Sequence, residues 1–110
     1  MSTMSAPAIE NRIRNANLLD VTELRRLLSA TVHRVANYFE HGYLLVLERR
    51  DGTLQAACHV ELERDRPTID LLVVDPATRD TAVRQRMIGV ASALCEAHGY
   101  HQPLAGAPLT

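Results

Sequence analysis

The chain has 110 residues, which is short enough for one domain and long enough for a single hydrophobic core. Its formal net charge is −1, from 12 basic and 13 acidic residues. The chain therefore lacks the strong positive field that drives nonspecific binding to nucleic acid. No apolar run approaches the ~18 residues of a membrane span, and no charged start leads into an apolar export signal, so we expect a cytoplasmic protein that does not associate with a membrane.

A weak alternation of polar and apolar residues near the amino terminus predicts the first ordered element. Residues 1–8 contain Ser, Ala and Pro without a period, so we expect a disordered amino terminus. The alternation around Ile13 predicts a strand over residues 11–15. Asp20, with Glu23 following at the spacing of a capping box, predicts the start of a helix.

Two amphipathic helices should follow this start. The first carries its apolar face at Val21, Leu24, Leu27 and Leu28. The second is expected over residues 31–41, ahead of Gly42, and its apolar face consists of Val32, Val35, Ala36 and Phe39.

The middle of the chain predicts a meander of three antiparallel strands. The first strand covers residues 43–49, and the return strand covers residues 53–63. The Asp51-Gly52 dipeptide between them predicts a tight turn because it accepts positive φ. The third strand, residues 69–74, is a short apolar run rich in β-branched residues, which is typical of a strand buried on both faces.

A long amphipathic helix follows the third strand. Asp75-Pro76 ends the strand, because proline cannot donate to a ladder. The helix should end at Gly99, since glycine suits the positive φ of a helix carboxyl terminus. Its apolar face consists of Val83, Met87, Val90, Ala91, Leu94 and Cys95. A strand, a loop and a helix amino terminus in this order offer a potential phosphate site.

The loop between this strand and this helix carries a recognisable motif. Residues 74–79 read Val-Asp-Pro-Ala-Thr-Arg and resemble the V-x-P-x-x-R that opens the coenzyme A motif of the GNAT superfamily of acyl-CoA-dependent N-acyltransferases. The family continues R-x-x-G-x-G/A and runs a helix to a glycine, a position that Gly99 occupies here. The resemblance covers about residues 9–100 and implies a GNAT-like α/β (α+β) fold with a mixed, mostly antiparallel sheet.

Two departures from the family pattern bear on function. Aligned without gaps, the first family glycine falls on Ala82 and the second on Arg84. Ala82 is a mild change, whereas Arg84 either pairs with phosphate as a cation or blocks the phosphate cradle. The family also adds a fifth strand, a helix and two more strands after the long helix. Here we expect residues 101–110 to form a tail or at most the start of the fifth strand.

The resemblance implies that acetyl-CoA or another acyl-CoA binds at the strand end, the loop and the helix start. The implied contacts are Leu72, Val73, Val74, Arg79, Asp80, Thr81, Ala82, Val83 and Arg84. Acyl transfer to an amine also needs a base, for which Glu61, Glu63 and Asp70 are the candidates on or beside the central strands. The family's usual acid, often a tyrosine in the missing part, has no counterpart that the sequence places.

The missing family elements also predict association. The strand at residues 69–74 would have one poorly covered edge, and an exposed apolar edge invites pairing with another chain. We therefore expect a homodimer or a partner protein at this edge, which would complete the groove for catalysis. No metal is expected, because the histidine pairs lack zinc-ligand spacing, and Cys58 and His59 are adjacent in a strand and point to opposite faces.

Two alternative functions remain open. A catalytically inactive GNAT-like half domain would act as a protein-interaction or regulatory module, which the changes at Ala82 and Arg84 favour. In a winged-helix interpretation, the two short helices and the following hairpin would bind DNA, with phosphate contacts from Arg25, Arg26 and Arg34. The negative net charge and the unexplained long helix argue against DNA binding.

Overall fold

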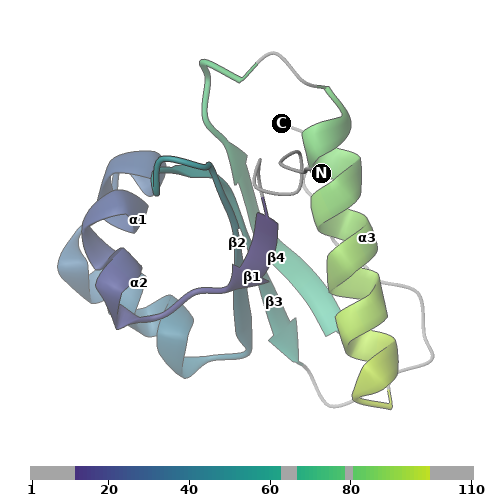
Figure 1. The fold of residues 1–110 in the computed structure, drawn as a ribbon. Coiled ribbons are helices and arrows are strands. Elements are labelled where there is room, and N and C mark those ends of the chain that lie inside the picture. The colour runs from purple at the N-terminus through teal and green to yellow at the C-terminus, as the bar shows by residue number, and fades with distance from the viewer. Residues whose placement is uncertain (1–11, 63–66, 79–80, 100–110) are drawn as a thin grey trace, which may run out of the picture.

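A computed structural model describes residues 12–62, 67–78 and 81–99, and its elements follow the expected order (Figure 1). They are β1 (Arg12–Asn15), the short 3-10 helix η2 (Leu18–Asp20), α1 (Val21–Leu28), α2 (Val32–Glu40), β2 (Tyr43–Glu48), β3 (Leu54–Leu62), β4 (Pro67–Val74) and α3 (Ala82–Ala97). The expected disordered amino terminus at residues 1–8 and the expected tail at residues 101–110 lie outside the described residues.

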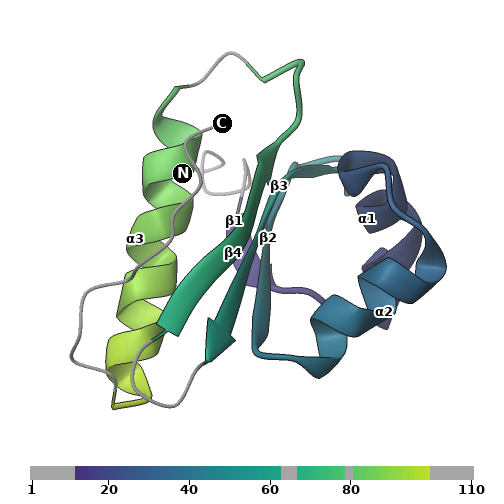
Figure 2. The ribbon, with the colours of Figure 1, turned by 180° about the vertical axis from the view of Figure 1, so that it is seen from behind.

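The strands form one sheet in the order β1-β2-β3-β4, and each described neighbour pair is antiparallel. Helix α3 covers one face of the sheet, and α1 and α2 cover the other (Figures 1 and 2). The core is therefore split in two by the sheet. The α3 side includes Leu45, Leu47, Ile69, Leu72, Met87 and Ala91, and the other side includes Leu24, Leu27, Val35, Leu44, Val46 and Leu54.

Helix α2 begins as expected, but the capping box lies one element earlier than predicted. Thr31 caps α2, because its side chain accepts a hydrogen bond from the Arg34 N–H. Asp20 makes no side-chain cap for α1, so the predicted Asp20-Glu23 box is wrong. Instead Asn17 caps η2, and the Asp20 carboxylate accepts from the Asn17 N–H at 2.8 Å, which forms the box there.

Arg14 explains why Asp20 turns toward β1. The guanidinium donates to both carboxylate oxygens of Asp20, at 2.8 and 2.9 Å. This pairing lowers the pKa of Asp20 below its usual value. The bidentate pair fixes the entry to α1, the helix that packs beside the candidate site.

β4 departs from the prediction that this strand is buried on both faces. Ile69 and Leu72 are buried against α3, whereas Val73 and Val74 are half-buried and Asp70 is exposed. The reason is that β4 lies at the edge of the sheet, where β3 is its only neighbour among the described strands. The continuous apolar run therefore belongs to an edge strand.

Helix α3 matches its predicted face closely. Val83, Met87, Ala91 and Cys95 are buried in the α3 core, while Val90 is 37% exposed. The helix ends before Gly99, whose φ of +92° is the left-handed conformation expected there. Within the described ranges, no helix has the length and apolar character to cross a bilayer.

Candidate functional site

A pocket of about 400 Å³ lies where β4 ends and α3 begins. Its lining combines the last residues of β4, the following loop and one residue from the first turn of α3. These residues are Leu72, Val73, Val74, Asp75, Pro76, Thr78 and Arg84. The structure thus brings together four of the residues predicted for coenzyme A, from two segments that the loop separates.

The other predicted contacts lie beside the pocket or outside the described chain. Thr81 and Ala82 are exposed at the start of α3. Val83 is 1% exposed, because its side chain packs in the α3 core; the prediction that this residue contacts a ligand is therefore limited to its backbone. Arg79 and Asp80 lie outside the described residues.

Backbone groups of β4 also point away from β3 next to the pocket. Asp75 N–H donates to the Gln55 carbonyl on β3 at 2.8 Å. Because hydrogen-bonded pairs alternate along an antiparallel ladder, the N–H and C=O groups of Val74 and Leu72 point away from β3. On that side, the described part of the chain supplies no further strand. An extended ligand with amide groups would therefore find backbone partners here.

Positive charge converges on the other wall of the pocket. Arg84 lies in the first turn of α3, which begins at Ala82. The amino end of a helix carries a partial positive charge, and the guanidinium adds a full one. The pocket keeps its volume with the half-buried Arg84 side chain in its wall. These features suit an anion such as phosphate.

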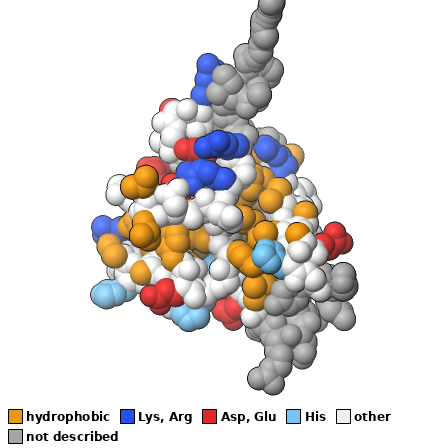
Figure 3. All heavy atoms as spheres, turned by 60° about the horizontal axis from the view of Figure 1, so that its bottom comes forward, with side chains coloured by type: hydrophobic (Ala, Val, Ile, Leu, Met, Phe, Trp, Pro, Cys, Tyr) orange, Lys and Arg blue, Asp and Glu red, His pale blue; other side chains and the backbone are white. Residues whose placement is uncertain are grey.

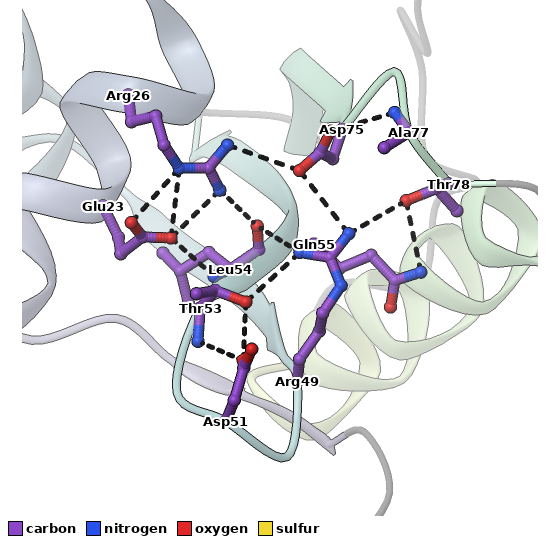
Figure 4. Close-up of polar contacts among 10 residues, drawn as sticks. All are labelled: Glu23, Arg26, Arg49, Asp51, Thr53, Leu54, Gln55, Asp75, Ala77 and Thr78. Atoms are coloured by element: carbon purple, nitrogen blue, oxygen red, sulfur yellow. Dashed lines mark hydrogen bonds and ion pairs between the residues drawn. The ribbon is translucent and has the colours of Figure 1, made fainter.

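The loop that closes the pocket is built around Asp75 (Figure 4). One carboxylate oxygen, Oδ1, accepts from the Ala77 N–H at 3.0 Å, and the Asp75 carbonyl accepts from the Thr78 N–H at 2.8 Å. The other oxygen, Oδ2, accepts from Arg26 at 3.3 Å and from Arg49 at 3.5 Å. The Ala77 bond and, next, the Arg26 bond lower the pKa of Asp75. The two oxygens of the Asp75 carboxylate therefore hold the loop in two ways: Oδ1 binds its backbone, and Oδ2 binds the two arginines.

Thr78 and Leu54 extend the cluster of polar contacts around Asp75 into β3 and α1 (Figure 4). The Thr78 hydroxyl accepts from the Gln55 side chain at 3.2 Å. Leu54 donates its N–H to Glu23 at 2.9 Å and accepts from Arg26 at 2.9 Å. Glu23, which was expected in a capping box, instead joins α1 to the start of β3. Sequence reasoning missed this cluster; its one local signal was Asp75 directly before a proline.

The candidate bases lie at different depths along the strands. Glu61 is half-buried on β3 and faces Thr68, four residues before Leu72 on β4, or about 13 Å along a strand. Asp70 is exposed and lies two residues before Leu72. Glu63 lies outside the described residues. Of the two described carboxylates, Asp70 is the nearer to the pocket.

A bulge in β4 brings Asp70 onto a buried histidine. His59 faces Leu71, whereas Val60 faces Ile69, so Asp70 is the extra residue of the bulge. Asp70 Oδ1 lies 2.6 Å from Nδ1 of His59, which is 1% exposed. Sequence reasoning found Asp70 and correctly placed His59 on the face opposite Cys58, but it missed the pairing of Asp70 with His59, which depends on the strand register.

Two further contacts of His59 come from α2 and from the residue that follows it. Its ring packs at 4.9 Å from the Tyr38 ring, and its Nε2 faces the carbonyl of His41. Both ring nitrogens therefore face oxygen acceptors, and both contacts are hydrogen bonds only when both nitrogens carry protons. On the other face of the sheet, burial raises the pKa of the Cys58 thiol to about 12, which makes it a poor nucleophile.

Other chemistries find less support in the described residues. Across residues 12–62, 67–78 and 81–99, no three His, Cys, Asp or Glu side chains are grouped to hold a metal ion. Arg26, one of the arginines on which the DNA-binding interpretation depends, pairs with Glu23 and Asp75 instead. The face in Figure 3 shows basic side chains in a small group beside acidic ones, without a broad basic surface.

Solved structures with the same chain path are numerous. N-acetylglutamate synthase from Neisseria gonorrhoeae, complexed with coenzyme A and N-acetyl-glutamate, has a TM-score of 0.71 at 19% identity over 82% of this chain and 23% of that chain. A GNAT family acetyltransferase from Brucella melitensis in complex with acetyl-CoA has a TM-score of 0.68 at 18% identity, over 83% and 71% of the two chains.

A third match shows how much of each chain is shared. A GNAT family N-acetyltransferase from Escherichia coli in complex with CoA has a TM-score of 0.72 at 17% identity, over 89% of this chain and 63% of that chain. This chain therefore spans less than two thirds of the Neisseria and Escherichia proteins. No protein-family model and no curated protein matches the sequence.

Proposed function

We propose that this chain, which has the GNAT fold, binds an acyl-CoA between β4 and α3 and transfers the acyl group to an amine. The observation that carries the proposal is the pocket at the end of β4. It combines outward-facing backbone groups of β4, a hydrogen-bonded turn and an arginine at a helix amino terminus. Similar structures from Brucella melitensis and Escherichia coli hold acetyl-CoA and CoA, respectively, which supports this choice of ligand.

Each part of the ligand has a chemical match in the pocket. The pantetheine arm is extended and contains amides, so it suits the outward N–H and C=O groups of Leu72 and Val74. The pyrophosphate is a doubly charged anion and suits Arg84 and the amino end of α3. In this arrangement the thioester lies toward the bulge and Asp70.

The acyl transfer then needs little more than positioning and one proton acceptor. The amine nitrogen attacks the thioester carbonyl carbon, the carbon–sulfur bond breaks, and the departing thiolate takes up a proton. A β4 N–H polarises the carbonyl oxygen, as a strand edge allows. Asp70, held by His59, is the base that the geometry favours for accepting the amine proton.

The first test of this proposal is calorimetric titration of the chain with acetyl-CoA. We expect saturable binding at one site per chain, weaker at moderate than at low salt because the phosphates contact a cation. We also expect a rise in the unfolding temperature with ligand concentration. No heat and no thermal shift at millimolar acetyl-CoA would remove coenzyme A from the proposal.

A second candidate keeps the pocket and omits the catalysis. Arg84 stands where the family pattern has a small residue. This departure favours a module that binds coenzyme A or a partner protein without turnover. Release of free thiol from acetyl-CoA in the presence of a panel of amines distinguishes the two: binding without release supports the module.

We also propose that a second copy of the chain covers the edge of β4. The edge strand carries half-buried apolar residues and has no neighbour on its outer side within the described ranges, and such an edge favours pairing. We expect light scattering after gel filtration to give twice the 12.2 kDa chain mass. A monomer that turns over acetyl-CoA at full rate would contradict the idea that a second copy completes the groove.

A further inference from the structure

We propose that Arg26 and Arg49 are positioning residues, which hold Asp75 so that the pocket-lining turn is in its binding shape before a ligand arrives. The ligand in this inference, the phosphates of coenzyme A, rests on the proposed function. The anchoring of the turn does not, because it is a property of the unliganded chain. Asp75 is an unspecified position of the V-x-P-x-x-R motif, so the motif gives this residue no role.

Three atoms of Asp75 make hydrogen bonds that hold the turn. Oδ1 accepts from Ala77 N–H, the main-chain carbonyl accepts from Thr78 N–H, and the main-chain N–H donates to Gln55. Pro76 fixes one further backbone angle. Asp75 and Thr78 both line the pocket, so a rotation of this turn would move the pocket wall directly.

The two arginines reach Asp75 from separate elements (Figure 4). Arg26 is on α1, 49 positions away in sequence, and Arg49 follows β2, 26 positions away. Arg49 also lies 3.5 Å from the Thr78 hydroxyl, so one guanidinium contacts both ends of the turn. The Asp75 side chain is only 12% exposed, which limits competition from water for these contacts. Two cations on one carboxylate therefore fix the turn against α1 and β2.

An electrostatic role and a positioning role of Asp75 predict opposite changes in the affinity for an anion when the Asp75 charge is removed. Removing a negative charge beside an anion site should strengthen anion binding, if Coulomb attraction alone decides. If Asp75 acts by holding the turn, its loss should weaken binding, because the ligand must then order the loop. Asp75→Asn separates the two effects, since asparagine keeps an oxygen for Ala77 but loses the charge that the arginines bind.

Asp51→Asn is the matched control. Asp51 lies in the same cluster, but its carboxylate accepts from Thr53, at 2.9 and 2.7 Å, rather than from the groups of the turn (Figure 4). The variant makes the same change in net charge within the same cluster. For acetyl-CoA measured by calorimetry on folded protein, we expect Asp75→Asn to weaken binding about tenfold and Asp51→Asn to leave it unchanged or slightly stronger.

Backbone hydrogen exchange without ligand tests the anchoring independently. We expect faster exchange at Thr78 N–H in Asp75→Asn and in Arg49→Gln, and no change there in Asp51→Asn. Unchanged exchange, or acetyl-CoA binding as strong as in the unmodified chain, would overturn the positioning role. If the unmodified chain binds no acetyl-CoA, the proposed function fails, while the exchange rates still decide whether the arginines anchor the turn.

Discussion

Replacement of Arg84 by glutamate is expected to weaken acetyl-CoA binding by about two orders of magnitude. Arg84 is in the wall of the pocket and in the first turn of α3, so a carboxylate there would face the proposed pyrophosphate position and oppose the helix dipole. Loss of the charge-assisted hydrogen bonds and gain of repulsion act in the same direction. Calorimetry at low salt, where screening is weakest, measures the effect.

Arg86→Glu is the control for a change of two charge units on the same helix. Arg86 is exposed on α3 and does not line the pocket, so we expect at most a small, salt-sensitive loss. Arg84→Gly then separates the two interpretations of Arg84 itself. A phosphate contact predicts weaker binding in this variant, whereas a plug in the cradle predicts stronger binding, which would contradict a role for Arg84 in holding phosphate.

Local sequence patterns were sufficient to predict the order of the elements and the junction at which the pocket lies. The period of apolar residues changes at Asp75-Pro76, and the motif at residues 74–79 identifies the strand-loop-helix junction, which is where the pocket lies. These signals are local because a strand end and a helix start are specified by neighbouring residues. The resemblance to the GNAT family added the ligand, and the structure confirmed the order of strands and helices that it implied.

The contacts that the sequence did not predict depend on register and on packing between distant segments. The pairing of Asp70 with His59 follows from a bulge, and no pattern within β4 shows where the extra residue falls. The contact of Arg26 with Asp75 joins α1 to the pocket, whereas sequence reasoning considered Arg26 only as a phosphate contact in the DNA-binding interpretation. A charged residue on the outside of a helix is exposed by default until a neighbouring element is known.

The error about β4 has a similar cause. A continuous apolar run predicts a strand that is covered on both faces. The half-buried Val73 and Val74 show that an edge strand gives the same run when a pocket lies beside it. Burial by protein and burial by a ligand require the same side chains, so the sequence alone does not separate them.

Replacement of Gly42 by alanine is expected to destabilise the fold by about 3–5 kcal/mol. Gly42 joins α2 to β2 at φ +85°, and a Cβ there would lie 2.0 Å from the Val60 carbonyl oxygen. The next contacts, at 3.0 and 3.1 Å, are also backbone atoms of β3, so no side-chain rotation relieves the clash. Relief requires β2 and β3 to separate where Tyr43 faces Val60.

Gly52→Ala isolates the clash from the cost of the backbone conformation. Gly52 has a φ of +92°, close to that of Gly42, but a Cβ there would have no neighbour within 4 Å. Its replacement should therefore cost only the left-handed conformation, about 1–2 kcal/mol. Urea unfolding of both variants gives the two losses on one scale. Equal losses would contradict the clash, because they would mean that β3 moves away from a Cβ at Gly42 without a measurable loss of stability.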